Sequence, residues 1–143
     1  MRGIEFKIPG LCVELLDGLD IGAYDWYLYE DEIIVSEQNY SIGPAVSGSQ
    51  VKEVLFHPNT LNIFMNLQAF PKGAAAEKVR DYPAFQHSQC AFVILVTDMR
   101  FVEIYAKSEK DNLLFHRNAK NCNGTELTVK TEENDGRTIF SVI

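Results

Sequence analysis

The stretch CAFVILVTDMRFVEIYAK, residues 90–107, carries the strongest structural signal in the chain. It contains two β-rich runs, 90–97 and 100–107, on either side of Asp98-Met99, and the first run is apolar almost without interruption. Such a run is typical of a strand that is covered on both faces of its sheet. We therefore predict a central strand followed by its antiparallel hairpin partner.

A helix is predicted directly after this hairpin. The pattern Ser108-x-x-Asp111 is typical of a helix N-cap, and Asn123-Gly124 is typical of a helix end. One helical stripe collects the residues expected to face the core: Asp111, Leu114, Phe115, Asn118, Ala119 and Cys122. Cys122 is therefore interpreted as the last core residue of this helix.

The C-terminal residues are predicted to form a second hairpin. Residues 126–130 alternate between polar and apolar side chains, and Asp135-Gly136 is a turn sequence that leads into 137–142. Glu133, Asp135 and Arg137 crowd this turn and form a candidate polar ligand cluster. The alternative, which the turn chemistry favours, is a plain hairpin turn with Arg137 paired across it.

The N-terminal half gives weaker signals of the same kind. Residues 4–8 alternate as in a half-buried strand, and a short helix follows that ends near Gly18. Ser47-x-x-Gln50 resembles a capping box before a helix that reaches His57-Pro58. Residues 61–69 are predicted to be a strand. Residues 74–89 are predicted to be weakly helical and interrupted at Pro83.

Together these elements predict an α+β fold in a single domain, residues 1–143. We expect a mostly antiparallel β-sheet of about six to eight strands, with three or four helices packed mainly on one face.

The segment YDWYLYEDE, residues 24–32, combines four aromatic and four acidic side chains. It is predicted to form strands 24–29 and 32–36 around a tight turn at Glu30-Asp31. Alternation places Tyr24, Trp26 and Leu28 on one face and Asp25, Tyr27 and Tyr29 on the other. The candidate protein-binding surface consists of Tyr24, Trp26, Tyr27, Tyr29, Glu30, Asp31 and Glu32. In the alternative interpretation both faces are covered, or the outer tyrosines only shield a solvated hairpin.

The formal net charge of −7 is concentrated in the first third of the chain. Residues 8–51 contain eight carboxylates and no Lys or Arg, whereas the remaining residues contain 12 acids and 13 bases. This distribution repels nucleic acid and anionic lipid, and it favours encounter with a basic protein partner. No apolar run is long enough to span a membrane, and the first residues lack the layout of a secretion signal, so we expect a cytoplasmic protein.

The Cys and His residues predict neither a metal nor a cofactor. Cys12, Cys90 and Cys122 are odd in number, far apart and in no CxxC pair, which predicts free thiols and a reducing compartment. The three histidines lie in separate elements without metal-binding spacing. His87 could activate the Cys90 thiol, but Cys90 opens an apolar strand, so a packing role is favoured.

Several phrases of the chain resemble one known family. They are YDWYL (24–28), QAFPKG (68–73), VILVTD (93–98) with FVEIYAK (101–107), NAK (118–120), and ENDGRT with FSV (133–142). Together they resemble an uncharacterised family of small proteins from Bacillus-type bacteria, known only as a domain of unknown function. The likeness extends over nearly the whole chain. It implies bacterial origin and a stand-alone protein, and it carries no catalytic residue to transfer.

Three functional hypotheses follow from the sequence. The leading one is a non-catalytic protein-binding module, inhibitor-like or immunity-like, that uses the acidic aromatic segment. The second is a small-ligand-binding or regulatory domain with a pocket between sheet and helices. The third is an enzyme of unrecognised type, which requires His87 to meet Cys90, or Glu133 to meet Asp135, in a cleft.

Overall fold

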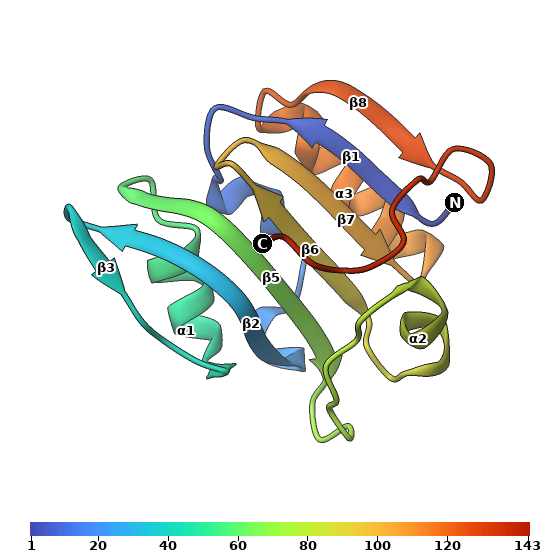
Figure 1. The fold of residues 1–143 in the computed structure, drawn as a ribbon, viewed down its shortest axis with the longest axis horizontal. Coiled ribbons are helices and arrows are strands. Elements are labelled where there is room, and N and C mark those ends of the chain that lie inside the picture. The colour runs from blue at the N-terminus through green and yellow to red at the C-terminus, as the bar shows by residue number, and fades with distance from the viewer.

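The sheet dominates the structure, a computed structural model that describes residues 1–143 (Figure 1). Eight strands form one sheet in the order β3-β2-β5-β6-β7-β1-β8, with β4 beside β2, and every pairing is antiparallel. The strands are β1 (Gly3–Lys7), β2 (Tyr24–Val35), β3 (Gln38–Tyr40), β4 (Ala45–Val46), β5 (Thr60–Pro71), β6 (Phe92–Thr97), β7 (Phe101–Ala106) and β8 (Thr125–Lys130).

The helical segments are few and mostly short. They are the 3₁₀ helices η1 (Val13–Leu16) and η2 (Ile21–Ala23), α1 (Gly48–Gln50) with the π-helical η3 (Val51–Leu55), α2 (Tyr82–His87) and α3 (Glu109–Asn121). The α+β prediction is therefore confirmed in its broad form, with more sheet and less helix than a balanced mixture.

The predicted central hairpin is confirmed. Strands β6 and β7 pair along their whole length, and Asp98 and Met99 turn the chain with φ values of 52° and 66°. The cap of α3 is also confirmed, because the Ser108 hydroxyl accepts a hydrogen bond from the backbone N–H of Asp111 at 3.0 Å. The capping box at Ser47 and Gln50 is present with both of its hydrogen bonds. These elements are specified by residues close together in sequence.

The two faces of the sheet carry different covers. We call them the helical face, which packs against η1, η3 and α3, and the tail face, which packs against α2 and the C-terminal residues 137–143 (Figure 1). The helical face and its helices bury the larger apolar cluster, 25 residues, while the tail face buries nine. The prediction that helices pack mainly on one face is confirmed.

The predicted turn at Glu30-Asp31 is wrong. Strand β2 continues through both residues to Val35, and the chain turns at Ser36-Glu37, where both residues have positive φ values. The long pairing of β2 with β5 shifts register between Leu28 and Glu30 and again between Glu32 and Ile33. Two local irregularities thus let a strand with a turn-like acidic centre stay in the sheet.

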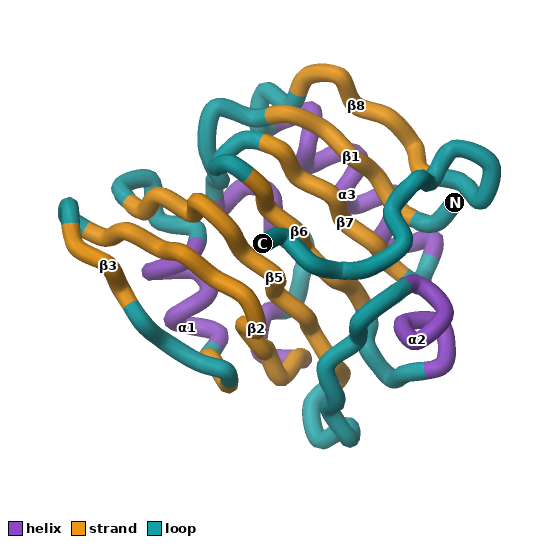
Figure 2. The backbone as a smooth tube through the Cα atoms, viewed as in Figure 1, coloured by secondary structure: helices purple, strands orange, loops and turns teal.

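The predicted C-terminal hairpin is also wrong. Residues 131–143 form no strand, and the chain beyond β8 crosses the tail face as an irregular segment (Figure 2). Pro83 does not interrupt a helix; it lies in the first turn of α2, whose N-cap Asp81 accepts a hydrogen bond from Ala84 N–H at 2.8 Å. Proline is tolerated at that position because its missing N–H has no helical partner there.

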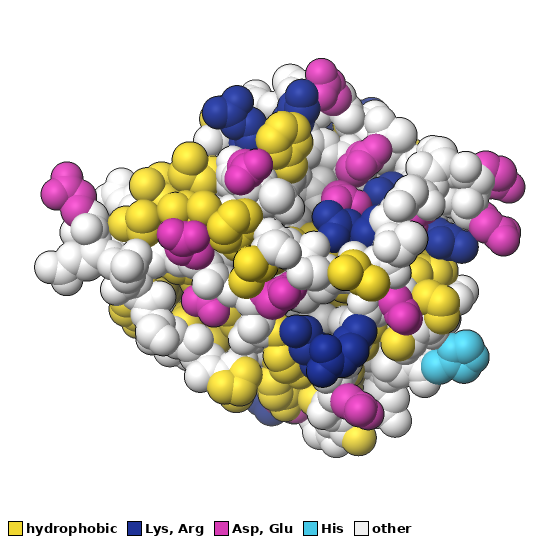
Figure 3. Space-filling view, in the orientation of Figure 1, with side chains coloured by type: hydrophobic (Ala, Val, Ile, Leu, Met, Phe, Trp, Pro, Cys, Tyr) yellow, Lys and Arg dark blue, Asp and Glu magenta, His cyan; other side chains and the backbone are white.

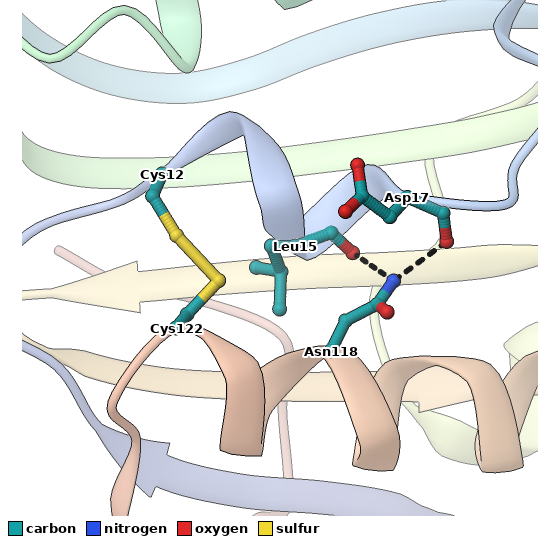
Figure 4. Close-up of a disulfide and its surroundings, with 5 residues drawn as sticks. All are labelled: Cys12, Leu15, Asp17, Asn118 and Cys122. Atoms are coloured by element: carbon teal, nitrogen blue, oxygen red, sulfur yellow. Dashed lines mark hydrogen bonds between the residues drawn. A yellow bond between two sulfur atoms is a disulfide. The ribbon is translucent and has the colours of Figure 1, made fainter.

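The expectation of three free thiols is wrong for Cys12 and Cys122, which form a disulfide (Figure 4). Their Cα atoms lie 6.6 Å apart, although 110 residues separate them in sequence. Beside the disulfide, the Asn118 side-chain amide donates to the carbonyls of Leu15 and Asp17 at 2.9 and 2.8 Å. The disulfide and this amide therefore fix η1 to α3, and free thiols no longer support a reducing compartment.

Candidate functional site

The side chains of the tail face form rows that cross the sheet. Residues directly opposite each other on neighbouring strands point to the same face. We name the rows by their composition. The tyrosine row is Tyr27, Gln68, Val93 and Tyr105; the charged row is Glu30, Asn66, Leu95, Glu103 and Glu5; the open row is Glu32, Phe64, Thr97, Phe101 and Lys7. Val79, α2 and the C-terminal tail, residues 137–143, cover most of the first two rows. In the open row Phe64 is half-buried against the edge of this cover, whereas Phe101 is exposed.

Glu103 is the centre of an ionic cluster on this face. The Arg137 guanidinium donates to Glu103 Oε1 from Nε at 3.0 Å and from Nη2 at 2.6 Å, and Lys130 Nζ donates to Oε2 at 2.9 Å. Lys130 also pairs with Asp135 Oδ1 at 3.3 Å, and the Tyr105 hydroxyl donates to the same oxygen at 3.0 Å. The Asp135 side chain is completely buried and that of Lys130 nearly so. These contacts anchor the start of the tail to β7 and β8.

The cluster shifts the pKa of its members in compensating directions. Burial acts to raise the pKa of Glu103, but hydrogen bonds from Arg137 and Lys130 outweigh it and hold the pKa below its usual value. Burial likewise acts to raise the pKa of Asp135, and the Arg137 N–H, the Tyr105 hydroxyl and Lys130 lower it overall. The pKa of Lys130 is raised, because its bond to Glu103 exceeds the effect of burial. All three groups are therefore held in their charged forms.

The tail beyond the cluster is held by polar side chains of the charged row. Asn66 Nδ2 donates to the Phe140 carbonyl at 3.0 Å, and Glu30 Oε1 accepts from Val142 N–H at 3.2 Å. Glu30 Oε2 also accepts from the Ser141 hydroxyl at 3.0 Å. The Phe140 ring is buried, 4.6 Å from the Tyr105 ring between centroids.

The predicted polar ligand cluster is only partly assembled. Asp135 and Arg137 do come together, around Glu103, but Glu133 is exposed and forms no ion pair. The favoured interpretation, a hairpin turn with Arg137 paired across it, is wrong because Arg137 pairs with Glu103 on β7 instead. A charged residue that follows a turn sequence, such as Arg137, can therefore form its ion pair with a residue of the sheet beneath it and not only with a residue across the turn.

The predicted aromatic surface is divided between the two faces. Trp26 is 1% exposed, and its indole N–H donates to the Ile21 carbonyl at 3.1 Å, so its assignment to a binding surface is wrong. Tyr24 packs beside Trp26 on the helical face. On the tail face Tyr27 and Tyr29 stack with centroids 6.1 Å apart, and Tyr29 lies next to Lys78.

The acidic part of that surface is divided in the same way. Glu30 is occupied by the tail, and Asp31 is half-buried with a pKa that burial raises. Of the three consecutive acids, only Glu32 is exposed. Of the surface predicted from sequence, only Glu32 and the stacked pair Tyr27 and Tyr29 remain available on the tail face.

His87 and Cys90 do not form the catalytic pair that the enzyme hypothesis requires. The Cys90 thiol is buried within hydrogen-bond distance of the carbonyls of Ala69 and Phe92, either of which can accept its one hydrogen, and burial raises its pKa to about 12. His87 is exposed, with Nδ1 2.7 Å from the Pro83 carbonyl. A neutral, buried thiol is a poor nucleophile. The packing role predicted for Cys90 is confirmed.

The expected pocket between sheet and helices is filled by the apolar core. A pocket of about 480 Å³ borders the open row and is lined by Lys7, Thr97, Phe101, Glu103 and Arg137 among others. Its cations are already paired, Arg137 with Glu103 and Lys7 with Glu126 at 2.8 Å. No group of three or more His, Cys, Asp or Glu side chains is arranged to hold a metal ion.

Apolar side chains are exposed around the open row. Phe101 is 42% exposed and Leu61 49%, and Met99 is exposed at the β6–β7 turn, where its N–H donates to the Ile63 carbonyl. Figure 3 looks onto the tail face and shows hydrophobic side chains gathered where β5 begins. The open row thus runs from Glu32 to Lys7 and passes exposed apolar side chains on either side of Thr97.

Sequence reasoning missed most of the polar residues of this face. Asn66 and Gln68 alternate with apolar residues in β5, a pattern that normally indicates a solvated face, yet both are completely buried. Lys130 at the end of β8 is 4% exposed. One signal was available in the sequence, namely polar residues at every second position of a predicted central strand. That pattern is compatible with a face exposed to solvent and equally with a face that hydrogen-bonds to a covering segment.

Comparisons with known proteins identify relatives without an assigned activity. A family model described as "Protein of unknown function (DUF2691)" matches residues 1–141. The chain is also similar to the "Uncharacterized protein YncE" of Bacillus subtilis (strain 168), with 28% identity over 151 aligned positions that cover 99% of each chain. No solved structure matches the chain. None of its helices combines the length and the apolar character that crossing a membrane requires.

Proposed function

The chain belongs to the DUF2691 family of proteins of unknown function, and from that premise, which assigns no activity, we propose that it is a non-catalytic protein-binding module. Its docking surface is the open row of the tail face with the apolar side chains beside it. An inhibitor-like or immunity-like role falls within the same proposal. So does a cytoplasmic location, although the Cys12–Cys122 disulfide removes one reason for expecting it.

The observation that carries the proposal is the exposed Phe101 ring in one row with the half-buried Phe64, at the edge of the tail-face cover. Phe64 and Phe101 lie in one row, and Leu61 and Met99 extend the apolar area. Aromatic residues and methionine are enriched in protein interfaces, where they contribute large contact areas. Exposed apolar patches rimmed by charge are typical of sites that are covered by a partner.

The charge distribution supports a partner with basic residues next to apolar ones. Glu32 borders the open row on β2, and Glu37 is exposed at the turn after it. Both belong to residues 8–51, which contain no Lys or Arg. A basic partner would therefore approach from the β2 side, and its apolar residues would meet Phe64 and Phe101.

A small-ligand site is less well supported by the same face. The pocket beside Phe101 has charged walls, but Arg137 and Lys7 are engaged by Glu103 and Glu126. A ligand would have to displace an existing partner for each charge that it contacts, which costs affinity. Protein docking needs no such exchange, because it can use the exposed side chains of Phe101, Leu61 and Met99.

The test is affinity capture from lysate of the native host at low and at high salt. We expect a protein retained by the wild type at low salt to be lost with Phe101→Ser and with Glu32→Lys. Glu14→Lys reverses an exposed acid in η1, away from the tail face, and serves as the matched control. Retention of the same protein by all three variants would reject the proposed surface.

A further inference from the structure

The C-terminal tail lies across the sheet without pairing as a strand. Residues 137–143 make no ladder with any strand, and the tail crosses β6 and β5 (Figure 2). Its one backbone bond outside the tail runs from Phe140 N–H to the Arg80 carbonyl at 2.7 Å. A cover held in this way separates from the sheet without breaking any strand pairing.

The side chains beneath the tail recognise main-chain atoms. Asn66 and Glu30 bind the Phe140 carbonyl and the Val142 N–H. Gln68 likewise binds the backbone of Val79. Its side-chain amide donates to the Val79 carbonyl and accepts from the Val79 N–H, both at 2.9 Å. Amide and carboxylate groups of the sheet thus hold two extended segments by their backbones, an interaction that does not depend on the sequence of the bound segment.

Sequence preference comes from two buried anchors in the tail. Phe140 is 3% exposed and packs against the rings of Tyr105 and Phe85, and Val142 is 5% exposed. Ile139 and Ile143 are exposed by 58% and 79%. Alternation of this kind is that of an extended peptide lying on a surface, with one aromatic anchor followed two residues later by an aliphatic one.

We propose that the groove beneath the tail is a peptide-binding groove that the chain's own C-terminus occupies, and that a partner's extended segment with an aromatic and, two residues on, an aliphatic side chain displaces the tail. The tail is the template for this occupant. Displacement of the tail would uncover the charged row, which lies directly beside the open row. The identity of the partner rests on the proposed function, whereas the groove itself does not.

The groove is tested with a fluorescent synthetic peptide of residues 137–143, RTIFSVI, added to the full-length protein. In the wild type the attached tail competes at an effective concentration on the order of millimolar, so binding is weak. Phe140→Asp removes the anchor of the attached tail and should tighten peptide binding roughly tenfold or more. Ile139→Asp changes an exposed tail residue and should bind the peptide like the wild type. Adding Glu30→Ala to Phe140→Asp should abolish the gain.

A second variant guards against loss of folding. Val142→Asp weakens the other anchor at the end of the chain, and circular dichroism with thermal melting monitors both proteins. Folded variants that bind the peptide no better than Ile139→Asp would overturn the proposal. Unfolding of both variants would overturn it too, because the tail would then be inseparable from the fold. The peptide assay needs no partner, so its failure is distinguishable from failure of the capture experiment.

Discussion

The helical and tail faces of one sheet are covered by two different kinds of interaction. On the helical face, rows such as Leu28, Leu67, Ile94 and Ile104 are apolar from strand to strand, and the covering η1 and α3 are joined by a disulfide. On the tail face, the cover is the short helix α2 together with an irregular C-terminal segment, and polar and charged side chains of the sheet hold that segment. The comparison shows that one face is specified by apolar packing and the other by hydrogen bonds and ion pairs.

The difference has an energetic meaning. Apolar burial is non-directional and tolerates small shifts of the cover, whereas a buried ion pair stabilises only when its geometry is satisfied. The side chains of Lys130 and Asp135 are nearly or completely removed from solvent. Lys130 therefore depends on Glu103 and Asp135, and Asp135 depends on Lys130, Arg2 and the Tyr105 hydroxyl. We infer that the ionic cluster fixes where the tail begins and adds less to stability than the apolar face does.

The largest effect is expected from the apolar face. Phe92→Ala removes a fully buried ring that packs against Trp26 and Phe115, and it should lower the free energy of unfolding by about 4 kcal/mol. Phe101→Ala deletes the same ring from the open row, where it is 42% exposed, and should cost less than about 1 kcal/mol. Urea unfolding measures both. Equal losses would mean that the open row is not open in solution.

A smaller loss is expected from the ionic cluster. Lys130→Met removes the cation that Glu103 and the buried Asp135 share. The loss should be about 3 kcal/mol, at the low end of the range for breaking a buried pair, because Glu103 keeps Arg137 and Asp135 keeps Arg2. Lys7→Met removes an exposed pair with Glu126 and should change stability by no more than about 0.5 kcal/mol. Similar values for the two lysines would show that the cluster is solvated.

Reduction of the disulfide should affect the helical face alone. The oxidised, denatured chain should titrate one thiol, Cys90, and reduction should lower the free energy of unfolding by about 2 kcal/mol. Hydrogen exchange should then quicken in η1, while the N–H groups of Phe140 and Val142 keep their rates. Three titratable thiols in the untreated chain would contradict the disulfide.

The sequence could predict those features of the fold that are specified by residues close together in the chain. The β6–β7 hairpin follows from an apolar run and a two-residue turn, and the start of α3 follows from Ser108 and Asp111. The core position of Cys90 also follows, because a free thiol at the start of an apolar run normally packs as a small hydrophobic residue. Each of these signals lies within one element.

What the sequence could not predict depends on residues far apart. Cys12 meets Cys122 only because η1 and α3 pack together on the helical face. Asp135-Gly136 has the chemistry of a hairpin turn, but Asp135 is drawn into the cluster with Tyr105 and Lys130. A local turn preference of a few tenths of a kcal/mol to about 1 kcal/mol is small compared with pairing of buried charges. The candidate site was missed for the same reason.

The smallest expected difference between the two faces is in how their contributions to folding stability depend on pH. The lowered pKa values of Glu103 and Asp135 mean that their contribution to stability is complete above the ordinary carboxyl range and is lost as the pH falls through their folded pKa values. Lys130 has a raised pKa, so its contribution is present at neutral pH and is lost only in strong alkali, above its ordinary value. Stability supplied by the tail face should therefore decline in acid.

Asp31 supplies a control of opposite sign. Burial raises its pKa, so protonation of Asp31 in acid favours the folded chain. Between pH 7 and pH 3 the urea midpoint of the wild type should fall; Glu103→Gln should flatten that fall, and Asp31→Asn should steepen it. A fall of equal slope in the wild type and in Glu103→Gln would mean that acid acts elsewhere than on the ionic cluster, and the contrast between the two faces would then rest on packing alone.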